Sequence, residues 1–302
     1  MAIGLLVPNE TARAPGLAAL GRVILLAAFL LAPGSGSDAR AAEPLTLAVH
    51  PYLPKSEVKA RFKPLARYIK ARTGREVRVI VADSYGAHIK NVGNGKADIA
   101  YLGPVSYVEL VQKYGPQKIL VRQADKGKPV FRGVIIARQD SDIKTLSQLK
   151  GKRFAFGAKE STMSHVIPEV MLHEAGVGVD DLASFDFVGG HKEVALSVLT
   201  GKFDAGGVKE EVFLDYDGRG LKALAHSPLM SEHIYVARET LDASLRAKLK
   251  KIMLDADGYG QGLAALKSIK GTLSAFVAAD DMNYDPLRRT MLTFSTLQAN
   301  RK

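Results

Sequence analysis

The segment FGAKESTMSH, residues 156–165, places four hydrogen-bonding side chains within five positions: Ser161, Thr162, Ser164 and His165. It stands between an apolar, strand-like run and a helix-like run. The first-turn N–H groups of a helix lack partners within the helix, and the helix end carries a partial positive charge. Such an end, with several side-chain donors added, suits a tetrahedral oxyanion. The alternative is helix capping, above all for Ser164. Three hydroxyls and a histidine exceed the needs of one cap, so we favour ligand binding.

Further candidates lie where other expected strands end. His191 follows FVGG, whose paired glycines let the backbone approach a ligand closely. Tyr85 follows the strand EVRVIVA. The structural alternatives are an exposed histidine at a helix start and a tyrosine at the edge of the core. Three more side chains are candidates, with packing or a solvated run of charge as the alternative: Tyr101, Glu210 and Glu211.

Composition and motifs argue against catalysis and metal binding. The chain has no cysteine, which excludes disulfides, thiolate metal sites and cysteine nucleophiles. It also lacks the G-x-S-x-G elbow, the H-E-x-x-H motif, the phosphate-binding P-loop and the G-x-G-x-x-G fingerprint. His165 and His173 stand eight positions apart, a poor spacing for a shared metal. We therefore expect a protein that is not an enzyme and that holds no cofactor and no metal.

The N-terminal residues indicate export. Arg13 and Arg22 precede the apolar run VILLAAFLLA, which is too short to span a bilayer as a helix. A break containing Pro, Gly and Ser follows, and then a site with small residues on either side of Arg40. This is the layout of a cleaved secretory signal peptide, and an uncleaved membrane anchor is the alternative. We expect residues 1–41 to be the signal peptide and the mature protein to reside in the periplasm.

The net charge favours small anions over nucleic acid. The formal charge is +11, but the Lys and Arg residues are scattered, with no arginine-rich run and no interleaved aromatic platform. An exported protein also rarely meets nucleic acid. We interpret the charge as a general attraction for small anions and expect no nucleic-acid partner.

Expected strands and helices alternate along the mature chain, which points to parallel α/β sheets. The amphipathic run EVKARFKPLARYIKARTG, residues 57–74, predicts a helix ended by glycine. A second helix is expected over residues 164–175, and closing helices from Leu241 onward. The strand-like runs are residues 45–49, 76–82, 97–103, 117–124, 131–138, 152–158, 185–189, 203–208 and 233–238.

Two stretches, GNGKADIAYLGP (residues 93–104) and LTGKFDAGGVKE (residues 199–210), resemble each other. Each is a helix end, a Gly-Lys-x-Asp turn and a short apolar strand. Repeated units this far apart suggest two lobes of similar build, with chance similarity as the alternative. We predict an α/β protein with a ligand cleft between two lobes. Lobe 1 would comprise residues 42–130 and 235–302, and lobe 2 residues 131–234.

The chain resembles a known family over about residues 45–237. GKADIAYLGPVSYV, GVIIARQDSDIKTLSQLKGKRFAFG, ESTMSHVIP and GGHKEVALSVLTGKFDAGGV are similar to segments of the periplasmic phosphate/phosphite/phosphonate-binding family of ABC transporters. The resemblance implies the two-lobed type II periplasmic-binding fold, closing on an oxyanion. In that family a serine/threonine-rich turn clasps the phosphorus oxygens, and it matches Ser161, Thr162 and His165 here. The strand-end histidine matches His191.

The same resemblance matches a first-lobe tyrosine to Tyr85 and an acidic residue to Glu210 or Glu211. This chain departs from the family pattern at three positions. Met163 replaces a serine that is common in the turn, with Ser164 next to it. Phe131, which we include as the tenth candidate ligand-binding residue, stands where a tyrosine is common and lacks its hydroxyl. Lys209 puts a cation where relatives that bind amino-phosphonates would prefer acids.

The resulting prediction is an exported solute-binding protein. It would capture a small oxyanion of the phosphate, phosphite or phosphonate class and deliver it to the membrane permease of an ABC transporter. The alternative is a periplasmic sensor for a membrane histidine kinase, responding to an oxyanion such as an arsenic or phosphorus species. We expect a monomer in either case.

Overall fold

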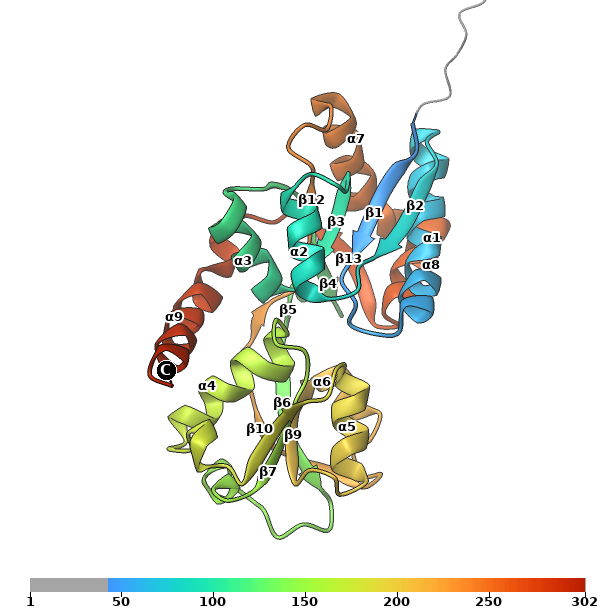
Figure 1. Cartoon of the computed structure of the whole chain (residues 1–302). Coiled ribbons are helices and arrows are strands. Elements are labelled where there is room, and N and C mark those ends of the chain that lie inside the picture. Colours follow the sequence, from blue (N-terminus) through green and yellow to red (C-terminus); the bar gives the residue numbers. More distant parts are fainter. Residues whose placement is uncertain (1–42, 302) are drawn as a thin grey trace, which may run out of the picture. The chain divides into compact units, whose positions relative to one another are not determined.

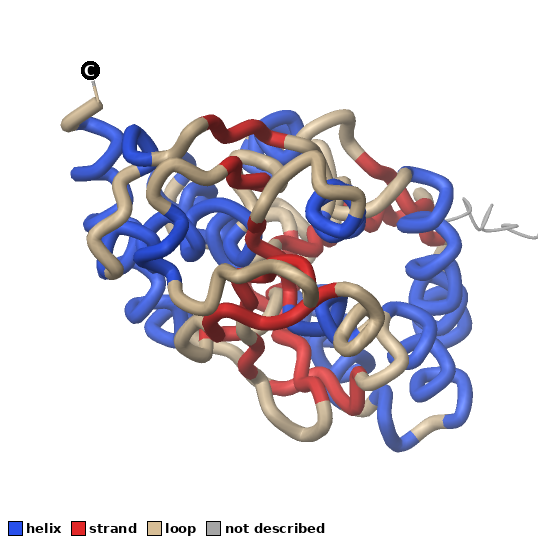
Figure 2. Tube along the Cα trace, turned by 90° about the horizontal axis from the view of Figure 1, so that it is seen from below, coloured by secondary structure: helices blue, strands red, loops and turns tan. Residues whose placement is uncertain are grey.

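The computed structural model describes residues 43–301 (Figure 1). The predicted signal peptide and its cleavage site lie outside the described residues. Within residues 43–301, the strands form a six-stranded sheet, a five-stranded sheet and a two-stranded ribbon. Figure 2 shows the strands in red running through the middle of this part of the chain, with helices in blue around them.

The six-stranded sheet has the order β13-β4-β12-β3-β1-β2. β1, β2 and β3 pair in parallel, whereas β12 is antiparallel to both β3 and β4, and β13 is antiparallel to β4. The carboxyl ends of β1, β3 and β4 therefore share one edge with the amino ends of β12 and β13. The strands are β1 (Leu45–Val49), β2 (Val77–Val81), β3 (Ile99–Leu102), β4 (Lys118–Asp125), β12 (Ile234–Ala237) and β13 (Leu273–Val277).

The five-stranded sheet has the order β10-β6-β9-β7-β8. β7 pairs in parallel with β8 and β9, and β6 is antiparallel to β9 and β10. The carboxyl ends of β7, β8 and β9 thus share an edge with the amino end of β6. The strands are β6 (Gly133–Arg138), β7 (Arg153–Phe156), β8 (Ser184–Phe187), β9 (Ala205–Lys209) and β10 (Leu221–His226).

The two segments of chain that join the sheets pair with each other. β5 (Val130–Phe131) and β11 (Met230–Ser231) form a short antiparallel ribbon. The six-stranded sheet therefore uses residues before 126 and after 233, and the five-stranded sheet uses residues 133–226. The lobe boundaries that we derived from the sequence remain a proposal.

Helices cover both sheets (Figure 1). α1 and α8 pack against each other, as do α2 and α3, and α5 packs on β9. The helices are α1 (Lys55–Thr73), α2 (Tyr85–Gly93), α3 (Pro104–Tyr114), α4 (Ile167–Glu174), α5 (His191–Leu199), α6 (Glu210–Leu214), α7 (Ala243–Leu254), α8 (Gly260–Ile269) and α9 (Asp285–Ala299). No helix within residues 43–301 is both long enough and apolar enough to cross a membrane.

The amphipathic pattern of residues 57–74 forms α1, as predicted. Its apolar stripe is buried, and the helix ends at Gly74, whose φ of 75° is the left-handed conformation that glycine adopts without steric cost. The buried positions include Val58, Phe62, Leu65 and Ile69. Burying four such side chains contributes roughly 1.5–3 kcal/mol each, so packing rather than intrinsic helix propensity holds α1 in place.

The prediction of parallel sheets was wrong, because both sheets are mixed. Where the chain returns from the five-stranded to the six-stranded sheet, β12 pairs antiparallel to its neighbours. Where the chain first enters the five-stranded sheet, β6 pairs antiparallel to β9. Alternating apolar residues give strand positions but not strand direction. The closing segment also contains β13, which we had expected to be helical.

The helix expected over residues 164–175 begins as a π-turn, Thr162–Val166, before α4 starts at Ile167. Pro168 explains the change, because proline has no N–H to donate to the carbonyl of Ser164. The turn widens instead, and Ile167 donates to the carbonyl of Thr162. The freed carbonyl of Ser164 accepts the N–H of Gly157 at 2.9 Å.

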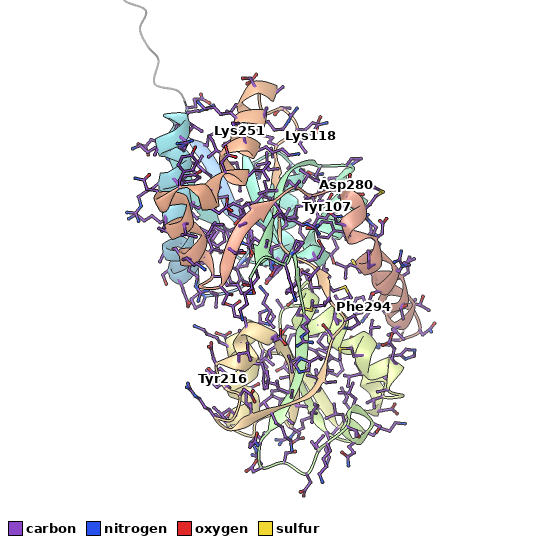
Figure 3. All side chains as sticks on the ribbon, turned by 180° about the vertical axis from the view of Figure 1, so that it is seen from behind. Tyr107, Lys118, Tyr216, Lys251, Asp280 and Phe294 are labelled. Carbon is purple, nitrogen blue, oxygen red and sulfur yellow. The ribbon has the colours of Figure 1, made fainter. Side chains whose placement is uncertain are left out.

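The C-terminal helix α9 packs against α4. Near its end, Gln298 Nε2 and an Arg301 guanidinium nitrogen each donate to Glu169 Oε1 at 2.7 Å. Phe294, labelled on this helix in Figure 3, has its ring centroid 5.1 Å from that of His165. α9 therefore contacts the residue range that we assigned to lobe 2, although its own residues fall in the range assigned to lobe 1.

Candidate functional site

A small cavity lies between the six-stranded and five-stranded sheets. It lies next to the carboxyl ends of β1 and β3 in the first sheet and of β7, β8 and β9 in the second. Its volume is about 10 Å³, which is close to the space that one water molecule needs. Residues next to the six-stranded sheet supply one wall: His50, Tyr85, Gly103 and His233. Residues next to the five-stranded sheet and in its following turn supply the other: Phe131, Glu160, Ser161, Thr162, Met163, His191 and Lys209.

Two hydroxyls of the serine/threonine turn reach this cavity. Ser161 and Thr162 both line it and both are buried. Thr162 Oγ1 accepts the N–H of Val105, at the start of α3, at 3.1 Å. That bond joins the turn to the opposite wall and leaves the hydroxyl proton of Thr162 free to be donated elsewhere.

The structure does not bring Ser164 and His165 to the cavity. Ser164 Oγ donates to the carbonyl of Gly207 in β9 at 2.7 Å. His165 Nδ1 donates to the carbonyl of Lys159 at 2.6 Å, and its Nε2 lies 3.1 Å from Glu169 Oε2. The π-turn rotates both side chains into the protein, so we no longer include them in the proposed site.

His191 presents a hydrogen-bond donor to the cavity. It is the first residue of α5 and is buried. Its Nδ1 accepts the backbone N–H of Lys209 at 3.1 Å, which assigns the proton of the neutral ring to Nε2. Burial lowers the pKa of His191 well below its usual value, and the charge of Lys209 and the proximity of His233 lower it further. Neutral His191 with Nε2–H is therefore the form at pH 7.

Tyr85 lines the small cavity, and its role as a donor stays a prediction. It is the first residue of α2, buried, with its ring centroid 4.9 Å from that of His50. Burial raises the pKa of Tyr85, and nearby Tyr52 and Glu160 raise it further. The phenol thus keeps its proton and can donate it.

Two histidines of the site were missed in the sequence. His50 directly follows β1, and His233 directly precedes β12, so both lie at the same edge of the six-stranded sheet. Tyr101 stacks against each of them, with ring centroids 5.0 Å from His50 and 5.1 Å from His233 and ring planes within 10°. Strand-end position was the signal for His50. For His233 there was no such signal, because the sequence does not indicate that β12 runs antiparallel and that its start lies at the same edge.

A larger cavity of about 580 Å³ adjoins the small one. Phe131, Lys209 and His233 line both. Three of the predicted residues, Tyr101, Glu210 and Glu211, line only the larger cavity. Of the ten candidates, five therefore line the small cavity: Tyr85, Phe131, Ser161, Thr162 and His191.

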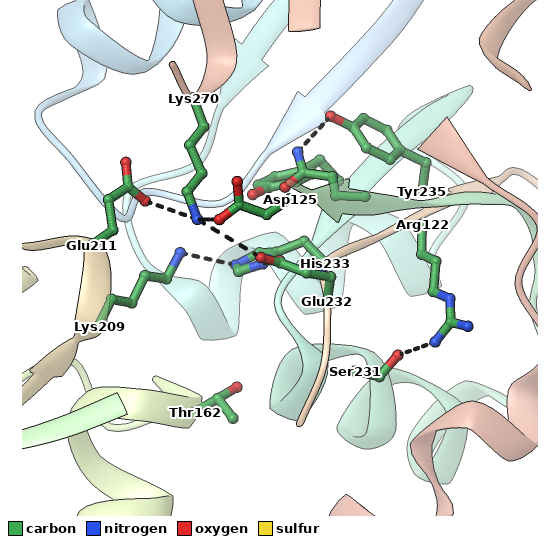
Figure 4. Close-up of polar contacts among 12 residues, drawn as sticks. Arg122, Asp125, Thr162, Lys209, Glu211, Ser231, Glu232, His233, Tyr235 and Lys270 are labelled. Carbon is green, nitrogen blue, oxygen red and sulfur yellow. Dashed lines mark hydrogen bonds and ion pairs between the residues drawn. The ribbon is translucent and has the colours of Figure 1, made fainter. Parts of the chain in front are cut away.

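A chain of polar contacts runs along the wall of the larger cavity (Figure 4). Lys209 Nζ donates to His233 Nε2 at 3.2 Å, and His233 Nδ1 donates to Glu232 Oε2 at 2.7 Å. Lys270 Nζ then lies 3.9 Å from Glu232, 2.7 Å from Asp125 and 3.5 Å from Glu211. The direction of these bonds makes His233 a neutral link between Lys209 and Glu232.

The pKa values agree with this assignment. Burial opposes ionisation of Glu232, but the bond from His233 and the charges of Lys270 and Lys209 outweigh it and lower its pKa to about 2. Burial and then the charge of Lys209 lower the pKa of His233 to about 4. Burial lowers the pKa of Lys209, while Glu211 and Glu232 raise it.

Glu210 and Glu211 differ in what holds them. Glu210 Oε1 accepts from Arg132 Nε at 2.6 Å and lies 3.4 Å from His226. Glu211 faces Lys270. Within residues 43–301 there is no group of three or more His, Asp or Glu side chains arranged to hold a metal ion.

Comparisons with known proteins show which family the chain belongs to. A sequence profile described as "ABC transporter, phosphonate, periplasmic substrate-binding protein" matches residues 47–284. The phosphate-import protein PhnD of Mycolicibacterium smegmatis is 26% identical over 272 residues, 82% of this chain and 84% of that protein. The probable ABC transporter phosphite binding protein PhnD1 of Prochlorococcus marinus is 29% identical over 161 residues, 51% of this chain and 54% of that protein.

Among solved structures, PhnD1 of Prochlorococcus marinus in complex with methylphosphonate has a TM-score of 0.77. The match covers 84% of this chain and 98% of that one at 19% identity, and it confirms the two-lobed fold predicted from the sequence. The family profile spans most of the chain and both strand edges that build the cavity. The chain therefore belongs to the family of periplasmic substrate-binding proteins of ABC phosphonate transporters.

Proposed function

We propose that this protein binds a phosphorus oxyanion in the small cavity and delivers it to the permease of an ABC transporter. The observation that carries the proposal is the convergence there of uncharged donors from both sheets. Ser161 and Thr162 come from one side, Tyr85 from the other, and His191 joins them with its Nε2–H. Lys209 adds a cation at the wall. A tetrahedral anion needs several converging donors of this kind.

Ligand entry requires the two walls to separate. A cavity of about 10 Å³ admits one water, whereas a phosphonate head has three oxygens and a carbon around phosphorus. The contact between Thr162 and Val105 spans the walls, and the ribbon of β5 and β11 links the sheets. We infer that the sheets rotate about this ribbon to open and that the contact re-forms on closure.

The arrangement supports binding without turnover. Within residues 43–301, neither the Ser161 nor the Thr162 hydroxyl is hydrogen-bonded to a His or carboxylate that could act as the base of a nucleophile. The relatives are named as import or binding proteins. We propose a non-catalytic monomer that is exported through cleavage of residues 1–41 and acts in the periplasm. The family's transporter role favours a permease over a sensor kinase as its membrane partner.

The test is a binding panel on the protein purified after expression of the full chain. Methylphosphonate, phosphite, phosphate, arsenate and sulfate would each be titrated by calorimetry. At a hundred times its dissociation constant, a ligand adds about 2.7 kcal/mol to stability, so a thermal shift of several degrees should accompany it. We expect at least one phosphorus oxyanion to bind more tightly than sulfate. A panel in which only arsenate binds, or none does, contradicts the proposal.

A further inference from the structure

Lys209 occupies the boundary between the two cavities. It is the last residue of β9, and it lines both cavities together with Phe131 and His233. Its Nζ lies 5.3 Å from the ring centroid of Tyr52 and 5.7 Å from that of Phe131. Any substituent that extends from an anion in the small cavity into the larger one must therefore pass the Lys209 ammonium.

The ammonium of Lys209 differs from the other partly buried cations of the larger cavity. Arg132 pairs with Glu210 at 2.6 Å, Arg61 with Glu57 at 2.9 Å, and Lys270 with Asp125 at 2.7 Å. Among residues 43–301, no carboxylate lies within ion-pair distance of Lys209 Nζ. The cavity's remaining lysines, Lys126 and Lys128, are exposed, where water screens their charge.

The donors of Lys209 are only partly used. An ammonium group has three N–H donors and no acceptor. One donor goes to His233 Nε2, and the contact chain to Glu232 fixes the position of Nζ. Two donors remain without a hydrogen-bond partner within residues 43–301, on a residue that lines both cavities. A fixed cation without a carboxylate partner favours an anionic group on the ligand and repels a cationic one.

The carboxylates of the larger cavity do not reverse this preference. Asp125, Glu211 and Glu232 all face Lys270. None of the three lines the small cavity. Glu160 lines the small cavity, which the phosphorus head would fill. A substituent of two or three carbons that enters the larger cavity passes Lys209 first, and an ammonium there would meet repulsion before it reached the acids that line only the larger cavity.

We propose that Lys209 makes this protein select phosphorus oxyanions that carry a second negative group, such as phosphonocarboxylates, over phosphonates that carry an amine. The inference rests on the proposed function, because it assumes that the phosphorus head occupies the small cavity. It adds the chemical class of the substituent.

The experiment compares three ligands of matched length: 3-phosphonopropionate, propylphosphonate and 2-aminoethylphosphonate, with methylphosphonate as the probe of the head alone. Dissociation constants are measured by calorimetry for the wild type, Lys209→Met, Lys209→Arg and Lys209→Glu, with Lys128→Met as the matched control. The wild type should bind the carboxylate ligand at least tenfold more tightly than the amine ligand. Lys209→Met should reduce this ratio to within threefold of unity, and Lys209→Glu should invert it.

Lys209→Arg and Lys128→Met should retain the wild-type ratio. The wild-type ratio itself needs no variant, so a variant that misfolds leaves the proposal testable. Equal wild-type affinities for the carboxylate and amine ligands, with methylphosphonate still bound, would overturn the selectivity and leave the proposed function intact. A Lys209→Met variant that no longer binds methylphosphonate but keeps the wild-type ratio of carboxylate to amine affinity would also overturn the selectivity. If none of the four ligands binds, the selectivity proposal fails, and the proposed function then depends on phosphite and phosphate in the binding panel.

Discussion

The two adjoining cavities hold polar groups in different ways. In the small cavity the donors other than Lys209 at its boundary are neutral: the hydroxyls of Ser161 and Thr162, the phenol of Tyr85 and the imidazole of His191. In the larger cavity the polar groups are charged and connected, from Lys209 through His233 and Glu232 to Lys270. Neutral donors cost less to bury than ions, so they can be packed tightly around a head group. The buried ions are stabilised by their contacts with one another, and the order of those contacts decides which charged group is left to interact with a ligand.

This difference predicts that the charged wall contributes more to stability than the neutral donors do. Glu232→Gln removes the carboxylate that accepts from His233 and faces Lys270. The pKa of Glu232 is about 2 against an ordinary value of 4.5. Its folded pKa is depressed, so its contribution is fully present above pH 4.5 and is lost as pH falls towards 2. The shift corresponds to about 3 kcal/mol, which is the loss expected at pH 7 in urea denaturation.

The control for that variant is Glu239→Gln. Glu239 pairs with Lys118 at 3.1 Å but is 67% exposed, so its loss should be below about 1 kcal/mol. At pH 3 the difference between Glu232→Gln and the wild type should shrink to about 1 kcal/mol, because the wild type has by then lost most of the benefit. An undiminished difference at pH 3 would mean that Glu232 acts through packing rather than charge.

Within the serine/threonine turn, two neighbouring serines should separate binding from stability. Ser161 lines the small cavity, whereas Ser164 Oγ is bonded to Gly207. Ser161→Ala should weaken methylphosphonate binding about tenfold and leave the ligand-free stability within about 0.5 kcal/mol. Ser164→Ala should leave binding unchanged and cost about 1–3 kcal/mol, because the buried carbonyl of Gly207 loses its donor. Calorimetry and urea denaturation on both variants check this. If Ser161→Ala lowered the stability and left the affinity unchanged, helix capping would be the correct interpretation of Ser161.

His191→Ala tests whether the small cavity works without charge. If the neutral Nε2–H contacts the ligand, affinity should fall by about the same factor, roughly five- to tenfold, at pH 7.5 and at pH 5.5. The pKa of His191 is lowered well below 6.5, so the ring stays neutral across this range. The lowered pKa also means that stability declines as pH falls below 6.5, where the unfolded chain takes up the proton. A loss of affinity that grows at pH 5.5 would show an imidazolium contact instead.

The smallest effect is expected at the boundary between the cavities. Phe131 lines both of them, and its ring centroid lies 5.1 Å from that of His233. Phe131→Tyr adds one donor, which should tighten methylphosphonate binding by about threefold, within the usual worth of one hydrogen bond. Weaker binding would indicate that the ring only packs and that the hydroxyl crowds the site.

Periodicity and position along the chain were sufficient for much of the fold. The apolar stripe of α1 and the glycine that ends it are local features, so their burial could be predicted from spacing alone. Strand ends were equally informative for Tyr85 and His191, because side chains that follow parallel strands gather at one edge. The same rule did not identify His233, because β12 runs antiparallel and its start, not its end, lies at that edge.

Ser161 and His165 show where sequence proximity misleads. They stand four positions apart, yet one lines the cavity and the other packs among Phe156, Phe187 and Phe294. The wide turn imposed ahead of Pro168 sets their directions. Composition predicts that such a cluster binds something, but backbone geometry decides which of its members can.

The sequence by itself determined the α/β class, the family and the hydroxyl turn, because these depend on local patterns of apolar and polar residues. Only the tertiary structure decided that His50 and His233, far apart in the chain, both stack on Tyr101, and that Lys209 faces a histidine rather than an acid. Those contacts join residues from separate strands and both sheets. Strand direction and sheet order fix them, and neither is encoded within any single segment.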